Sequence, residues 1–130
     1  MIVKGLSYTS KMIVGEKDTA ENVGSGTLKV LATPSLAALM ENAAMNAVAS
    51  EIEQGQTTVG SSLAVAHLCP TAVGKEVEAK AVLVDADGRK LCFEIEAREL
   101  DGTLIGTAKH TRYIVNADRF MKKLFERSFD

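Results

Sequence analysis

The fold is decided by the stretch Thr33-Pro34-Ser35-Leu36-Ala37-Ala38-Leu39-Met40-Glu41-Asn42-Ala43-Ala44-Met45-Asn46-Ala47-Val48-Ala49-Ser50. It predicts one long helix from Pro34 to Gln54, about 30 Å long at ~1.5 Å per residue. Thr33 is the expected N-cap, because its hydroxyl can accept a hydrogen bond from an early amide. Pro34 is expected at the first helical position, where the missing N–H costs nothing, and Gly55 is expected to end the helix.

This helix has almost no polar face until its last turn. Leucine, methionine and alanine occupy nearly every side, and a helix that is apolar all round is normally buried in a core or a membrane. Glu41, Asn42 and Asn46 interrupt the apolar run before it reaches the ~20 residues that a bilayer requires. The sequence therefore predicts a buried helix with a carboxylate in its middle, and no membrane partner.

The rest of the chain is dominated by strand patterns. Alternation of apolar and polar residues predicts strands at residues 7–14, 27–31, 57–68, 76–84, 90–98 and 103–115. Residues 15–26 are expected to be a loop and residues 116–127 a short amphipathic helix. Asp-Gly pairs at 87–88 and 101–102 predict tight turns. The expected class is α+β, a hotdog fold in which a curved antiparallel sheet wraps around one long buried helix, as a single domain over residues 1–130.

Composition narrows the classes of protein to consider. The 130 residues carry a net charge of −2, which argues against a nucleic-acid partner. Cys69 and Cys92 lack CxxC spacing and are expected to be reduced thiols. Two histidines and two cysteines form no cluster of metal ligands, so we expect no metal. Because residues 1–5 lack the apolar core of a signal peptide, the expected location is cytoplasmic.

A few residues stand out as candidates for chemistry. Glu41 is either a structural carboxylate paired with a strand or another subunit, or a general base or nucleophile. His67 ends an apolar strand and is either a satisfied structural group or an acid–base catalyst. Gly60 indicates a close approach between strand and helix. Arg112 and His110 share the last strand, where both are candidates for plain surface groups.

Two blocks, residues 30–43 and 60–67, resemble the fluoroacetyl-CoA-thioesterase-like family of hotdog thioesterases. Weaker matches follow at residues 70–74, 87–88 and 106–112, so that the resemblance extends from Tyr8 to Phe120. It implies a homodimer that hydrolyses acyl-CoA thioesters in a cleft along the subunit interface. It also implies that no metal or cofactor takes part, since CoA is a portion of the substrate.

The resemblance also assigns residues. The family's catalytic Thr, Glu and His match Thr33, Glu41 and His67, and its substrate contacts match Gly60 and Arg112. As a hypothesis, Glu41 attacks the thioester or activates a water, and His67 protonates the departing thiolate. Thr33 orients a water, the imidazole or the acyl group, and amides including that of Gly60 polarise the carbonyl. Arg112 and the basic C-terminal residues bind CoA phosphates, unless Arg112 holds an acyl carboxylate.

Helix geometry limits this assignment. Thr33 and Glu41 lie about 12 Å apart along a continuous helix and about 80° apart around it, so they cannot touch directly. Either the chain bends, or the substrate spans the gap, or one group comes from another subunit. Between Ala20 and Thr33 there is no Phe, Tyr or Trp, which argues against an aromatic gate and against fluoroacetyl-CoA as the substrate. A short- or medium-chain acyl-CoA is the expected substrate.

Two other functions remain open from the sequence. The chain is alternatively a non-catalytic hotdog module that binds acyl-CoA. An enoyl-CoA hydratase-like activity is less favoured, because no Asp lies close to His67.

Overall fold

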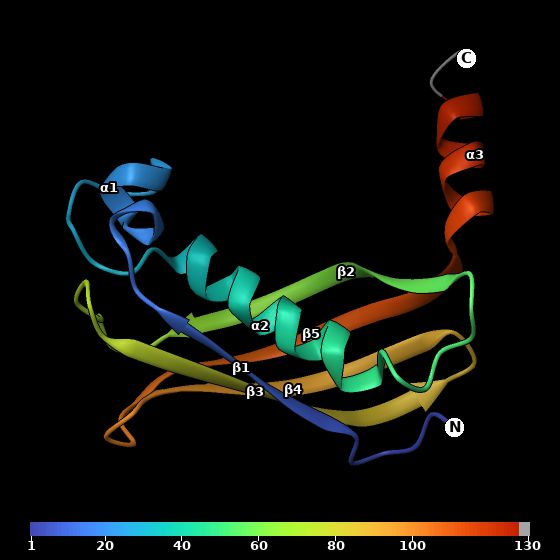
Figure 1. Cartoon of the computed structure of the whole chain (residues 1–130), viewed down its shortest axis with the longest axis horizontal. Coiled ribbons are helices and arrows are strands. Elements are labelled where there is room, and N and C mark those ends of the chain that lie inside the picture. The colour runs from blue at the N-terminus through green and yellow to red at the C-terminus, as the bar shows by residue number, and fades with distance from the viewer. Residues whose placement is uncertain (128–130) are drawn as a thin grey trace.

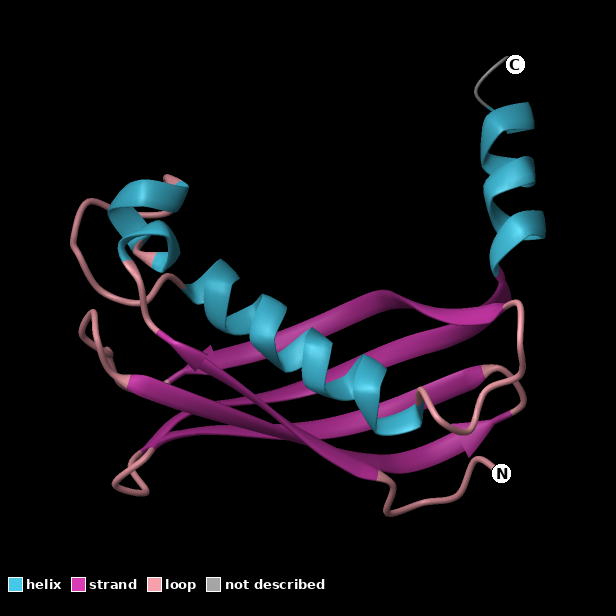
Figure 2. Cartoon of the chain, viewed as in Figure 1, coloured by secondary structure: helices cyan, strands magenta, loops and turns pink. Residues whose placement is uncertain are grey.

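The computed structural model describes residues 1–127, in which a five-stranded antiparallel sheet curves around one helix, α2 (Figures 1 and 2). The strand order is β1-β3-β4-β5-β2, so β1 and β2 are the two edges. The strand bounds are Ser7–Ile13 (β1), Gln56–His67 (β2), Glu76–Asp87 (β3), Lys90–Glu99 (β4) and Leu104–Asn116 (β5). This arrangement confirms the predicted α+β class and the curved sheet around a long helix.

The sheet is built from strands with one apolar face. In β4, alternate side chains are buried against the helix: Leu91, Phe93, Ile95 and Ala97. The residues between them include exposed glutamates on the outer face. Gly88 adopts φ +60° in the turn between β3 and β4, which is why a glycine follows Asp87 there. The period-2 pattern therefore identified these strands to within a few residues.

Helix α2 spans Thr33–Val48 and lies across the concave face of the sheet (Figure 1). Its sheet-facing side is fully buried, and the side chains with no exposed surface are Leu36, Met40, Ala43, Ala44 and Val48. The opposite side is not covered in the single chain, where Met45 is 38% exposed. The expectation of a helix buried all round is therefore wrong for this face. The helix also ends six residues before Gln54, and turns replace its expected last part.

The start of α2 differs from the sequence prediction. Ala32 is the N-cap, with no side-chain cap, while Thr33 and Pro34 are the first two helical residues. The Thr33 hydroxyl is hydrogen-bonded to His67 instead of to a helix amide. The predicted capping role of Thr33 is therefore wrong, because a distant strand residue takes the hydroxyl.

The segment before α2 is also more ordered than expected. The expected loop contains a 3₁₀ turn, η1 (Glu16–Asp18), and a short helix, α1 (Ala20–Val23), which Thr19 caps. Residues 27–31 make no regular strand. Only isolated bridges join Val30 to Ala72 and Leu31 to Thr19, since this run crosses the end of the fold rather than extending the sheet.

After β5 the chain forms helix α3 (Ala117–Arg127), as predicted, and α3 stands away from the sheet (Figure 1). Within residues 1–127, no helix is long and apolar enough to cross a membrane.

Candidate active site

The first polar pair of interest joins the start of α2 to the end of β2. Thr33 Oγ1 lies 2.8 Å from Nδ1 of His67, a hydrogen bond between residues 34 positions apart. Both residues line a cavity of about 330 Å³ whose other walls are Ala20, Ser25, Val30, Leu31, Ala32, Leu68, Cys69 and Pro70. Two of the three residues that the resemblance assigned to catalysis are therefore in contact, at one end of the sheet.

The imidazole of His67 is half-buried beside Thr33. Burial lowers the pKa of His67 below its usual value of 6.5, against an opposing effect of the Cys69 backbone. Within residues 1–127 its Nε2 is buried and has no hydrogen-bond partner. A neutral imidazole has one donor and one acceptor nitrogen, and Nδ1 is already engaged with Thr33. Nε2 is therefore the ring nitrogen that no described group engages.

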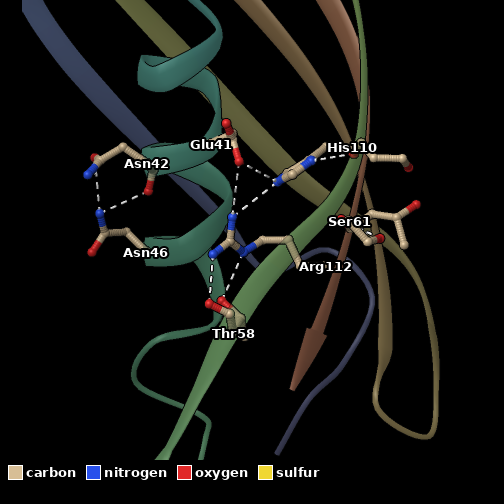
Figure 3. A network of polar contacts seen from close by, with 9 residues as sticks. Glu41, Asn42, Asn46, Thr58, Ser61, His110 and Arg112 are labelled. Atoms are coloured by element: carbon tan, nitrogen blue, oxygen red, sulfur yellow. Dashed lines mark hydrogen bonds and ion pairs between the residues drawn. The ribbon is translucent and has the colours of Figure 1, made fainter. Parts of the chain in front are cut away.

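A second polar cluster surrounds Glu41 in the middle of α2 (Figure 3). Oε2 of Glu41 lies 3.7 Å from Nη1 of Arg112 and 4.0 Å from Nε2 of His110. Gly60 of β2 lies against the same carboxylate, since a Cβ built there would be 2.8 Å from Oε2 of Glu41. The predicted close approach of helix and strand at Gly60 is therefore present, and it is the glutamate that fills the space.

Arg112 is held rigidly beneath this carboxylate. Its Nε donates to Oγ1 of Thr58 at 2.9 Å, and its Nη2 donates to the Thr58 carbonyl oxygen at 2.9 Å. Nη1 donates to Nε2 of His110 at 3.2 Å. Burial lowers the pKa of Arg112, but the Glu41 charge opposes that shift. The guanidinium is thus a fixed positive charge facing the glutamate.

The same contacts determine the state of His110. Because Nε2 accepts from Arg112, the ring proton is on Nδ1, which donates to the Ser62 carbonyl oxygen at 2.7 Å. Burial, more than the nearby Arg112 charge, lowers the pKa of His110. His110 is therefore a neutral ring that orients Arg112.

His110 and Arg112 are only 2% and 6% exposed, so the alternative that they are surface groups is wrong. The alternation of β5 contained the signal, since Ala108, His110 and Arg112 follow one another at spacing two on the buried face. Thr58 was not identified from the sequence. It became visible only through the register of β2 with β5, in which Gly60 faces Arg112.

The two clusters are separate within one chain. No hydrogen bond or ion pair in the described part of the chain joins Glu41 to Thr33 or to His67. Along β2, Gly60 and His67 are seven residues apart, which corresponds to roughly 23 Å at ~3.3 Å per residue. One chain therefore presents a carboxylate with its arginine in mid-sheet, and a Thr–His pair at the end.

The sequence model of the family described as fluoroacetyl-CoA-specific thioesterase matches residues 14–118. The chain belongs to this family. A fluoroacetyl-CoA thioesterase from Streptantibioticus cattleyicolor is 31% identical over 101 residues, which are 77% of this chain and 71% of that protein. Membership identifies the chain as a thioester hydrolase and confirms the resemblance stated from the sequence.

Solved structures agree with the fold. A structure of a fluoroacetyl-CoA thioesterase superposes with a TM-score of 0.90 at 25% identity, covering 97% of each chain. A hot-dog-like protein from Thermanaerovibrio acidaminovorans superposes with a TM-score of 0.85 at 21% identity, covering 95% of this chain and 91% of that one. The hotdog fold predicted from the sequence is thereby confirmed.

Proposed function

We propose that the protein hydrolyses a short- or medium-chain acyl-CoA thioester to the free acid and CoA, and that Thr33, Glu41 and His67 do so at the interface of a homodimer. The observation that carries the proposal is the Glu41 carboxylate, which is 43% exposed in a single chain and lies against the buried charge of Arg112. A carboxylate fixed in this way and open on one side is available to attack a thioester or to activate a water.

The dimer is proposed from the free edge of β2. This edge strand is 12 residues long and contains no charged residue and no proline. Natural proteins usually protect long edge strands with such residues, because exposed N–H and C=O groups pair with other chains. A twofold axis at this edge would pair two β2 strands antiparallel.

Antiparallel pairing of β2 would bring the Glu41 cluster of one chain close to the Thr33–His67 pair of the other. It directs Gly60 of one copy toward His67 of the other, so Glu41 of one chain approaches the Thr33–His67 pair of the second. Of the three possibilities left open by helix geometry, the proposal adopts the one in which the groups come from different subunits.

The proposed reaction needs no cofactor. The Glu41 carboxylate attacks the thioester carbonyl to form a mixed anhydride, or takes a proton from a water that attacks instead. In the first route the C–S bond breaks, CoA leaves as a thiolate, and water then hydrolyses the anhydride to the free acid and the Glu41 carboxylate. In the second route the water oxygen bonds to the acyl carbon and the C–S bond breaks. In both routes one proton of the water reaches the CoA thiolate through His67, while Thr33 holds the imidazole through Nδ1. Backbone amides near Gly60 polarise the carbonyl oxygen.

The contacts of Arg112 favour a role other than the predicted binding of CoA phosphates or of an acyl carboxylate. Its side chain is only 8% exposed and three of its nitrogens are hydrogen-bonded within the chain. We therefore propose that Arg112 positions Glu41 rather than binding CoA phosphates. The acyl group is placed in the cavity beside Thr33, where Ala20 and Val30 form small apolar walls.

The proposal is tested by release of free thiol from acyl-CoA esters of increasing chain length. The wild type is compared with Glu41→Gln and His67→Ala, and with the exposed-site control Glu53→Gln. We expect turnover with at least one ester, its loss in the two site variants and its retention in the control, with unchanged circular dichroism and oligomeric state. Ester binding without any thiol release by the wild type would instead support an acyl-CoA-binding module.

A further inference from the structure

Helix α3 presents an apolar face that no other part of residues 1–127 buries. None of its 11 residues is buried, and Phe120, Met121 and Leu124 are 42%, 46% and 44% exposed. Helices shorter than ~12–15 residues are marginally stable alone in water. A short helix that extends from the sheet with three large apolar side chains exposed is therefore expected to pack on another surface (Figure 1).

A matching surface lies at the opposite end of the sheet, around the Thr33–His67 cavity. Leu68, which lines the cavity, is 54% exposed. Val23 and Leu28 are 44% and 67% exposed and belong to the segment before α2, which also supplies Ala20, Ser25 and Val30 to the lining. The lining of this cavity includes no Phe, Tyr or Trp. The apolar part of the lining is therefore made of small and aliphatic side chains, without a large aromatic ring.

The charges of the two surfaces are complementary. Residues 16–23, which contain η1 and α1, carry three acidic side chains and one basic one: Glu16, Asp18, Glu21 and Lys17. Helix α3 carries four basic and two acidic side chains: Arg119, Lys122, Lys123, Arg127, Asp118 and Glu126. Opposite net charge favours contact between these segments and disfavours contact between two copies of α3.

The topology determines where α3 lies in the proposed dimer. Asn116 pairs with Gln56, and the Ala117 amide donates to the Gly55 carbonyl oxygen, so α3 begins at the Gln56 end of β2. The cavity lies at the His67 end. When two β2 strands pair antiparallel, the Gln56 end of one copy lies beside the His67 end of the other. α3 starts at the end of β5, which lies two strand spacings, or about 10 Å, from the partner's β2. The helix is about 16 Å long, so it can reach across this distance.

We propose that α3 of each copy covers the Thr33–His67 cavity of its partner, so that Phe120, Met121 and Leu124 form the missing apolar wall of the acyl site. This inference rests on the dimer of the proposed function. It makes each substrate site depend on the second copy for acyl binding as well as for the carboxylate.

The test is chemical crosslinking, which does not require turnover. In a Cys69→Ala/Cys92→Ala background, Leu68→Cys is combined with Phe120→Cys or with Leu124→Cys and treated with a short bifunctional maleimide. The control pair combines Leu124→Cys with Leu100→Cys, since Leu100 is 67% exposed in the β4–β5 turn. Sedimentation of the untreated proteins establishes their oligomeric state.

The proposal expects a covalent dimer from one or both Leu68 pairs and none from the control. Crosslinking only within a monomer, or none in a protein that sediments as a dimer, overturns the α3 contact and leaves the dimer standing. A monomer overturns both. If the crosslinks form but no ester is hydrolysed, the α3 contact holds and the proposed activity fails.

Discussion

Nη1 of Arg112 lies 3.7 Å from Oε2 of Glu41, with the side-chain-free backbone of Gly60 beside them. Thr58 and His110 fix the remaining face of the guanidinium, so that the arginine cannot turn away from the glutamate. The guanidinium of Arg112, which is only 6% exposed, would be costly to bury without such a charged partner. The α2 helix, the β2–β5 register and this ion pair therefore form one unit.

Arg112→Lys is expected to lower turnover at least tenfold, because one ammonium nitrogen replaces the planar fork whose three nitrogens reach Thr58 and His110. The free energy of unfolding should fall by about 1.5–3 kcal/mol, the usual size of a lost hydrogen bond to a charged group. Urea unfolding and thiol release measure the two effects. Arg98→Lys is the control, since Arg98 forms an exposed pair with Glu96 and its replacement should change neither quantity measurably. Equal effects of the two substitutions would refute the positioning role.

Gly60→Ala should displace the Glu41 carboxylate, because the new Cβ would lie 2.8 Å from Oε2. We expect kcat to fall at least tenfold while the protein remains folded, as the glutamate end can move toward solvent. Gly15→Ala is the matched control, since its Cβ would meet only ordinary contacts at 3.5 Å or more. Unchanged kcat in Gly60→Ala would show that the position of this carboxylate does not matter for turnover.

Thr33→Val removes the hydroxyl that contacts His67 while keeping the shape of the side chain. A role in orienting the imidazole predicts a fall in kcat and a shifted pH–rate profile, whereas Thr33→Ser should retain most of the rate. Steady-state kinetics across pH 5.5–8.5 distinguish the variants. A serine variant as impaired as the valine variant would count against the hydrogen bond.

The buried imidazole of His110 and the half-buried imidazole of His67 should make stability depend on pH. Burial lowers the pKa of both His67 and His110 in the folded protein below the usual 6.5. Below that value the unfolded chain binds protons that the folded one does not, so stability is complete above about pH 6.5 and is lost as the pH falls. Urea unfolding at pH 7.5 and 5.5 measures the loss. Because the chain has only these two histidines, the double variant His67→Asn/His110→Asn should flatten this dependence.

Much of this architecture was predictable from local pattern. The strands and the core side of α2 follow from periodicity, because each buries one apolar face. The Thr33–His67 contact depends on a pairing 34 residues apart, and no local rule distinguishes that hydroxyl from a helix cap. His110 was visible in the alternation of β5, yet its bond to Arg112 required the folded strand. Residues 1–127 leave one face of α2 and one face of α3 exposed, and the proposed dimer accounts for the face of α3.

The most direct test of the central claim, a site shared between two copies, is activity of a mixed dimer. One chain carries Glu41→Gln and the other His67→Ala, and the mixed species is isolated through two different affinity tags. If Glu41 and His67 act across the interface, one of the two sites contains both intact residues. Thiol release should then be about half that of the wild-type dimer, although each parent homodimer is inactive. A mixed dimer no more active than its parents would contradict the shared site, because each chain would then rely on its own Glu41 and His67.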